Sequence, residues 1–259
     1  MIKTQIQVKA QISNKEIWRI ALPIMLGNMA QTIINFTDTA FLGHVGVIAL
    51  GASMLAGLFY LLFTTVAAGF AIGIQIIVAR RFGERNYGRI GIIFEHGSLF
   101  VLLLGSILFS ILYFFSDRLL LMLIDSPNLY EASVEYIKCR QFGILFVCFN
   151  YLYRALYVGI SNTKVITYST LIMAVVNILL DYCLIFGNLG FPQMGISGAA
   201  LASLSAELSA FIFFTAYSYI TLRKKEFGIF KAYRLESELM GRILKISTPT
   251  MVQKLFSFG

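Results

Sequence analysis

Residues 48–78 read IALGASMLAGLFYLLFTTVAAGFAIGIQIIV, a stretch without a single charged side chain. A helix on the surface of a soluble domain needs only one apolar stripe, whereas this stretch is mainly apolar on every side. A helix that crosses a membrane needs about 20 such residues, because the hydrocarbon core is about 30 Å thick. The stretch therefore predicts a helix that spans a lipid bilayer.

Five further stretches have the same character. They are residues 17–43, 90–115, 141–160, 165–186 and 195–222. Another begins near Ile246 and runs to Gly259, and the short apolar run 119–124 is expected at the membrane interface. Apolar residues make up 58% of the 259 positions and charged residues only 13%, unlike the balance of a soluble domain. These patterns predict an all-α polytopic membrane protein.

Lysine and arginine are concentrated in alternate segments between these stretches. The segments before the first span and after the second, fourth and sixth hold 16 of the 21 basic residues. Because cytoplasmic loops of membrane proteins are enriched in basic residues, we expect a cytoplasmic N-terminus in the plasma or inner membrane of the cell. The net charge of +8 is then a topology signal. Its short clusters are not interleaved with stacking aromatics, so no nucleic-acid partner is expected.

A short internal repeat concerns the domain organisation. Residues 17–25 (IWRIALPIM) recur in similar form as residues 243–251 (ILKISTPTM). Six spans return the chain to the cytoplasm, so a second half would start on the same side as the first. We therefore expect a six-helix lobe over residues 1–222, a cytoplasmic linker over 223–245 and the truncated start of a second lobe over 246–259. A complete seven-span protein is the less favoured alternative.

Ionisable residues inside the spans hold most of the functional information, because a charge in the membrane needs a partner, a proton or water. The acidic ones are Asp38, Glu95, Asp181 and Glu207. Asp38 lies 19 residues beyond Arg19, about 28 Å along a helix, and Asp181 lies 17 residues beyond Lys164, about 26 Å. Both spans run outward, so the two carboxylates reach nearly the same depth.

Two more polar residues reach this depth. Asn177 precedes Asp181 by four residues and shares its helix face. Ser203, on the sixth span, lies about 12 Å below the outer end of its helix. Oxygen ligands suit a hard cation such as Na⁺, and paired carboxylates suit a proton. We expect Asp38, Asn177, Asp181 and Ser203 to form a cation site; the alternative is that the two carboxyls only hydrogen-bond neighbouring helices.

The remaining membrane residues admit plainer interpretations. Glu207 either joins this network or serves substrate. Glu95, beside His96 near the inner end of the third span, is expected to snorkel or to pair with cytoplasmic arginines, and Arg154 to snorkel. Pro23 removes one backbone hydrogen bond and predicts a bend of the first span, although a static kink would explain it too.

Catalytic chemistry is not indicated. His44 and His96 have no partner at a zinc-site spacing. Cys139, Cys148 and Cys183 fall in or beside apolar segments and are expected to be free packing residues. No phosphate-binding loop is present, so ATP-driven transport by this chain is not expected.

Several strings in order resemble the N-terminal half of the multidrug and toxic compound extrusion (MATE) family. They are IALP at 20–23, DTAFLGHVG at 38–46, ARRFG at 79–83, NILLD at 177–181 and GISGAALAS at 195–203. The resemblance implies twelve helices in two six-helix lobes that alternate in access around a central cavity. It further implies a cation site at Asp38, Asn177 and Asp181, with Ser203 where a threonine is usual.

The same resemblance implies a function. It implies export of amphipathic, often cationic organic compounds, coupled to inward movement of H⁺ or Na⁺, with no other cofactor. The expected partners are such drug-like compounds, membrane lipids and a C-terminal lobe that is missing here. The alternatives are a flippase for lipid-linked oligosaccharides in the same superfamily and a truncated fragment that does not transport. An enzyme is not expected.

Overall fold

The computed structural model describes residues 14–222, 227–231 and 234–257, where the regular elements are helical. Its helices are α1 (Asn14–Val45), α2 (Val47–Gly83), α3 (Tyr87–Leu121), α4 (Pro127–Arg140), η1 (Gln141–Gly143), α5 (Ile144–Gly159), α6 (Lys164–Phe186), η2 (Asn188–Gly190), α7 (Gly195–Thr221) and α8 (Ser237–Phe256). The two η elements are single 3₁₀ turns. The basic residues Lys3, Lys9, Arg223, Lys224 and Lys225, and the chain end at Gly259, lie outside the described residues.

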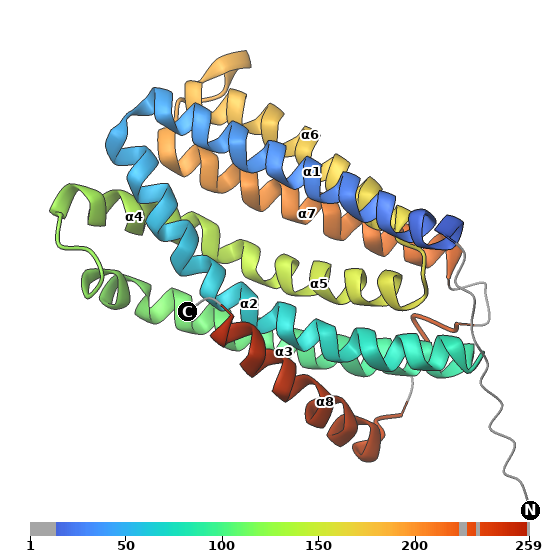
Figure 1. Cartoon of the computed structure of the whole chain (residues 1–259). Helices are drawn as coiled ribbons and strands as arrows, with labels where there is room; N and C mark the ends of the chain where they lie inside the picture. Colours follow the sequence, from blue (N-terminus) through green and yellow to red (C-terminus); the bar gives the residue numbers. More distant parts are fainter. Residues whose placement is uncertain (1–13, 223–226, 232–233, 258–259) are drawn as a thin grey trace, which may run out of the picture.

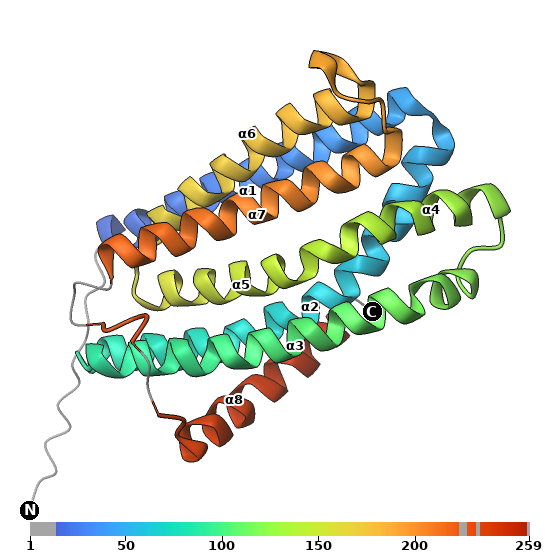
Figure 2. The same cartoon turned by 180° about the vertical axis from the view of Figure 1, so that it is seen from behind.

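The helices form two groups, which both views show (Figures 1 and 2). One group consists of α1, α6 and α7, and the other of α2, α3 and the continuous pair α4–α5. Contacts of α4 and α5 with α7, and of α1 with α2, join the two groups. The last helix, α8, packs on α2 and also touches α3. Residues from six different helices therefore meet between the groups.

Five helices in the described part of the chain are long and apolar enough to cross a membrane, and they confirm five of the predicted spans. The helix over the first predicted span, α1, is continuous for 32 residues but is not among the five. Its polar residues Asn28, Gln31, Asn35 and Asp38 account for its lower hydropathy. Three of these residues line a cavity instead of meeting lipid, as described below.

The predicted fourth span, 141–160, ends where the helix ends but starts too late in the sequence. The spanning helix runs over Pro127–Gly159, through α4, η1 and α5. Two of its charged residues contact α7, since Arg140 pairs with a carboxylate there and Ser197 Oγ donates a hydrogen bond to Glu135 Oε1 at 2.5 Å. A charged side chain that has a partner on a neighbouring helix costs less to bury than an unpaired one. The helix can therefore start earlier than its hydropathy suggests.

Two other boundaries differ from the sequence prediction. The apolar run 119–124 is not a separate segment, because α3 continues to Leu121 and the rest forms the turn after it. The seventh helix begins at Ser237, well before the predicted Ile246. Its polar first turns are followed by Ser247, whose hydroxyl donates to the Phe70 carbonyl of α2 at 3.2 Å. Contact with α2 thus holds α8 in place.

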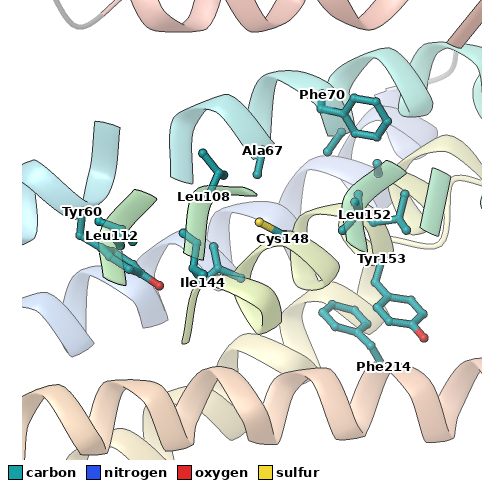
Figure 3. Packing of buried hydrophobic residues seen from close by; sticks show 14 of the residues in the cluster. Tyr60, Ala67, Phe70, Leu108, Leu112, Ile144, Cys148, Leu152, Tyr153 and Phe214 are labelled. Carbon is teal, nitrogen blue, oxygen red and sulfur yellow. The ribbon is translucent and has the colours of Figure 1, made fainter. Parts of the chain in front are cut away.

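A buried core joins α2, α3, α5 and α7 (Figure 3). It includes Ala67, Phe70, Leu108, Leu112, Ile144 and Leu152. Tyr153 of α5 stacks on Phe214 of α7, with ring centroids 5.4 Å apart and planes inclined by 9°. Cys148 lies in this core with a free thiol, and Cys139 and Cys183 are also free, as predicted. Aromatic packing between α5 and α7 therefore ties the two helix groups together.

Glycines set the closest helix approaches. A methyl group added at Gly198 of α7 would lie 2.7 Å from the carbonyl carbon and oxygen of Leu184 on α6. At Gly73 of α2, it would lie 2.6 Å from Cα of Ser247 on α8. Backbone atoms cannot rotate away as a flexible side chain can, so both positions require glycine. Small residues thus let α7 approach α6 and α2 approach α8 closely.

Replacing Gly198 with alanine is expected to push α7 away from α6 and to lower the free energy of unfolding by about 1–3 kcal/mol, the usual cost of overpacking. The matched control is Gly57→Ala on α2, where an added methyl group meets nothing within 4 Å. Thermal unfolding of the purified variants in detergent, followed by circular dichroism, measures the difference. Equal stability of the two variants would contradict the close approach.

Candidate functional site

A cavity of about 760 Å³ lies between the two helix groups. It is lined by α1, α2, α4, α5, α6 and α7. Its charged lining residues are Asp38, Arg140, Arg154 and Glu207, and its apolar and aromatic ones include Leu58, Tyr60, Val147, Met173 and Phe214. A cavity of this size with apolar walls and a few charged groups suits an amphipathic small molecule.

The predicted carboxyl pair is brought together at one edge of this cavity. Asp38 of α1 and Asp181 of α6 lie close enough for their carboxyl groups to interact electrostatically. Asn177, one turn before Asp181, is 1% exposed, and Asp181 is fully buried. Asp38 lines the cavity, whereas Asn177 and Asp181 lie behind it and do not. Asp38 therefore connects the cavity to two buried polar groups.

These three side chains carry buried polar atoms with no hydrogen-bond partner in the described part of the chain. They are one carboxyl oxygen of Asp38, both carboxyl oxygens of Asp181, and both the amide oxygen and nitrogen of Asn177. Two ionised carboxylates offer each other only acceptors, so their contact needs a proton or a cation between them. Most buried polar atoms in proteins have partners, so this buried cluster has the chemistry to share a proton or to hold a cation.

The other two residues of the predicted site have separate surroundings. Ser203 is half-buried on α7, does not line the cavity and makes no hydrogen bond to the carboxyl pair within the described residues. Helix α1 continues through Pro23, and Thr167 Oγ1 of α6 donates to the Pro23 carbonyl at 2.6 Å. This bond fixes α1 to α6 at the point where proline removes a bond within α1.

An ion pair that the sequence prediction missed lies across the cavity. Arg140 of α4 binds Glu207 of α7 through two parallel contacts, one of them Nη1 to Oε2 at 2.6 Å. The Arg140 guanidinium also lies 4.4 Å from the ring centroid of Tyr60. Asn150 donates to the backbone carbonyl of Glu207 at 2.9 Å. Glu207 thus pairs with Arg140 and not with the Asp38–Asp181 pair, and it also lines the cavity.

Gly143 makes room for this pair. A methyl group at Gly143 would collide with Glu207 Oε2 and would lie 2.8 Å from Arg140 Nη1. One feature of the sequence indicates that this helix starts well before Arg140. Pro127 suits the first turn of a helix, and no other proline follows before residue 192.

Glu95 and His96 accept hydrogen bonds from the backbone of the segment before α8, and no arginine among the described residues forms an ion pair with Glu95. Glu95 Oε1 accepts a hydrogen bond from the Phe230 N–H at 2.7 Å. His96 Nε2 accepts from the Glu236 N–H at 2.9 Å, so its Nδ1 bears the proton and donates to the Ile92 carbonyl at 2.8 Å. Both side chains therefore dock the segment before α8 against α3. Arg154, which was expected to snorkel, is one of the residues that line the cavity.

Long apolar helices around a cavity with charged walls are typical of membrane transport proteins. Residues 23–183 match the MatE family profile, and the chain belongs to this family. It is 28% identical to a probable multidrug resistance protein NorM of Agrobacterium fabrum, over 90% of this chain and 50% of that protein. A NorM relative of Thermotoga maritima is also 28% identical, over 95% of this chain and 53% of the relative. The chain spans about half the length of these curated relatives.

Solved structures agree with this assignment. A MATE protein in a conformation described as bent superposes with a TM-score of 0.82 at 25% identity, over 93% of this chain and 53% of that chain. An outward-facing multidrug resistance MATE transporter gives a TM-score of 0.82 at 24% identity, over 93% and 52%. The fold is therefore that of one half of a MATE transporter, as the sequence predicted.

Removing one partner of the buried pair should be costly. Glu207→Leu leaves the Arg140 charge without its carboxylate and is expected to destabilise the protein by about 3–5 kcal/mol. The double variant Arg140→Met/Glu207→Leu removes both charges and should recover most of that loss, because an apolar pair of similar volume often replaces a buried ion pair. Unfolding in detergent measures both variants. A double variant less stable than Glu207→Leu would show that the two residues do not act as a pair.

Proposed function

We propose that this chain forms the ion-coupled half of a multidrug antiporter. The transporter would export amphipathic, often cationic organic compounds and admit H⁺ or Na⁺ in return. The position of Asp38 carries the proposal, because Asp38 faces both the cavity and the buried group formed by Asn177 and Asp181. An ion at that group and a compound in the cavity would therefore compete for one carboxylate.

The competition has a simple electrostatic basis. A cation at Asp38 and Asp181 neutralises the charge that would otherwise attract a positively charged compound into the cavity. When the ion leaves, Asp38 regains its negative charge and can pair with the compound. Each ligand thus weakens the binding of the other, which is the linkage that antiport requires. Ser203 would supply a further oxygen if α7 moved toward the site.

The arrangement of the whole transporter follows from the same proposal. Residues 1–222 would form the first lobe, residues 223–245 a cytoplasmic linker, and residues 246–259 the start of a second lobe. The N-terminus would be cytoplasmic, in the plasma or inner membrane. Pro23 would let α1 change its bend when the ion leaves, because α1 lacks a backbone hydrogen bond there.

Carbodiimide labelling tests the ion site on the chain itself. Dicyclohexylcarbodiimide enters apolar sites and reacts with protonated carboxyls, so Asp38 and Asp181 should be labelled in sodium-free buffer. Added NaCl should reduce labelling if Na⁺ binds, relative to choline chloride, whereas sensitivity to pH alone identifies H⁺. Mass spectrometry of peptides locates the label. The exposed Asp125 is the internal control. If neither added Na⁺ nor a change of pH altered the labelling of Asp38 and Asp181, the proposed ion site would be contradicted.

Transport should depend on the same carboxyls. In everted vesicles from cells that express the whole transporter of which this chain would form half, an imposed ion gradient is expected to drive dye uptake. Asp38→Asn and Asp181→Asn should reduce uptake to that of vesicles without the protein, because neither amide holds an exchangeable charge. Asp125→Asn, a matched change at an exposed position, should leave uptake unchanged. Ion-driven uptake at the normal rate in Asp181→Asn would contradict the coupling role.

A further inference from the structure

The segment before α8 packs closely on α3. A methyl group added at Gly91 of α3 would collide with the carbonyl oxygen of Phe227, so the two backbones are in contact there. The ring centroid of Phe227 lies 5.4 Å from that of Tyr87, and the ring centroid of Phe230 lies 6.3 Å from that of Phe94. The surface of α3 is therefore shaped to receive this segment.

Three polar side chains of α3 hold the segment in this place. Glu95 accepts the hydrogen bond from the Phe230 N–H, and His96 accepts the one from the Glu236 N–H. Arg89 Nη1 contacts both carboxylate oxygens of Glu236, at 2.7 and 2.8 Å. The ion pair is exposed, whereas the side chain of His96 is 1% exposed. His96 is thus the one of the three contacts that is fully withdrawn from water.

Phe230 adopts an unfavourable backbone conformation in the docked segment. Its φ of +63° lies in the left-handed region, which residues with a β-carbon rarely adopt. Such a conformation persists only where the surrounding contacts fix it. Loss of the contacts with α3 would let Phe230 return to an ordinary backbone conformation, so release of the segment is favoured once its hydrogen bonds weaken.

The contact between His96 and Glu236 requires a neutral imidazole ring. Nδ1 of His96 donates to the Ile92 carbonyl, so Nε2 is the nitrogen that accepts. A second proton on Nε2 would remove this acceptor and set a new N–H against the Glu236 N–H. Histidine ordinarily changes its charge between about pH 5 and 8. Because the docked segment requires the neutral ring, docking should weaken as the pH falls.

The charged and titratable groups around His96 do not replace the lost acceptor. Glu95 interacts electrostatically with His96 and favours the protonated ring, but its carboxylate already accepts the Phe230 N–H. Tyr153 of α5, which interacts electrostatically with Glu95, shares a hydrogen bond with Thr215. The ion pairs on the elements packed against this part of α3, within the described residues, are Arg89–Glu236, Arg81–Glu84 on α2 and Arg242–Glu238 on α8.

We propose that His96 is a pH-sensitive latch, whose protonation releases the segment before α8 from α3. Helix α8 itself packs on α2, so release would change how α8 is connected without breaking that packing. The latch binds only a proton and needs no other ligand. Its existence does not depend on the proposed function. Only the compartment whose pH it senses does, because the proposed topology places this segment in the cytoplasm.

Hydrogen–deuterium exchange of the full chain in a neutral detergent tests the latch at the Glu236 amide, which electron-transfer fragmentation isolates. After correction for the intrinsic pH dependence of exchange, protection of this amide in wild type is expected to fall about tenfold per pH unit below about pH 6.5, because release is coupled to one proton. His96→Gln keeps an oxygen that can accept the Glu236 N–H but does not titrate, so its protection should stay constant from about pH 8 to 5.

The matched control is His44→Gln, which changes the other of the two histidines and should behave as wild type. Arg89→Gln removes the ion pair and should lower protection at every pH while keeping its pH dependence. Protection in wild type that stays constant from about pH 8 to 5 would overturn the latch and leave the proposed function untouched. So would a pH dependence that persists in His96→Gln.

A second measurement decides the result if His96→Gln does not fold, as judged by gel filtration. In His44→Gln, His96 is the sole histidine, so the ¹³Cε1 nuclear magnetic resonance signal of labelled histidine reports the protonation of its ring alone. This signal should titrate over the same pH range in which the Glu236 amide loses protection. Loss of protection while the ring stays neutral would contradict the latch.

Discussion

The ion pair between Arg140 and Glu207 joins the two helix groups at the cavity. Charges withdrawn from water stabilise a fold only when their geometry is good and their other hydrogen bonds are satisfied. Here two parallel contacts, the ring of Tyr60 and the packing space left by Gly143 meet that requirement. The pair lets a helix with basic residues continue into the membrane, and it fixes α4 against α7. The junction places α4 against α7, two of the six helices that line the cavity.

The polar residues of α1 explain why its hydropathy is lower than that of the other spanning helices. Asn28, Gln31, Asn35 and Asp38 make α1 less apolar than the other spanning helices, yet it packs on α6 and is continuous. A helix can keep such residues in a membrane when they face a cavity rather than lipid. Asp38 then serves two environments, the cavity and the buried Asp181. The low hydropathy of α1 is thus a consequence of the site.

Charge balance in the cavity involves two acidic positions. Arg140 and Glu207 form an ion pair whose charges cancel. Under the proposed function, an ion at Asp38 and Asp181 would cancel the charge of those carboxylates as well, so that a positively charged compound would be favoured only after the ion leaves.

The amino-acid sequence alone determined the membrane spans, because long apolar stretches have no other stable placement. It also determined the depth match of Asp38 and Asp181, since helical rise converts residue number directly into distance. The start of the fourth span, the partner of Glu207 and the orientation of Arg154 were decided only by the tertiary structure. Hydropathy scores each charge as if it stood alone, whereas the cost of a buried charge depends on a partner that lies far away in sequence, as Glu207 lies from Arg140.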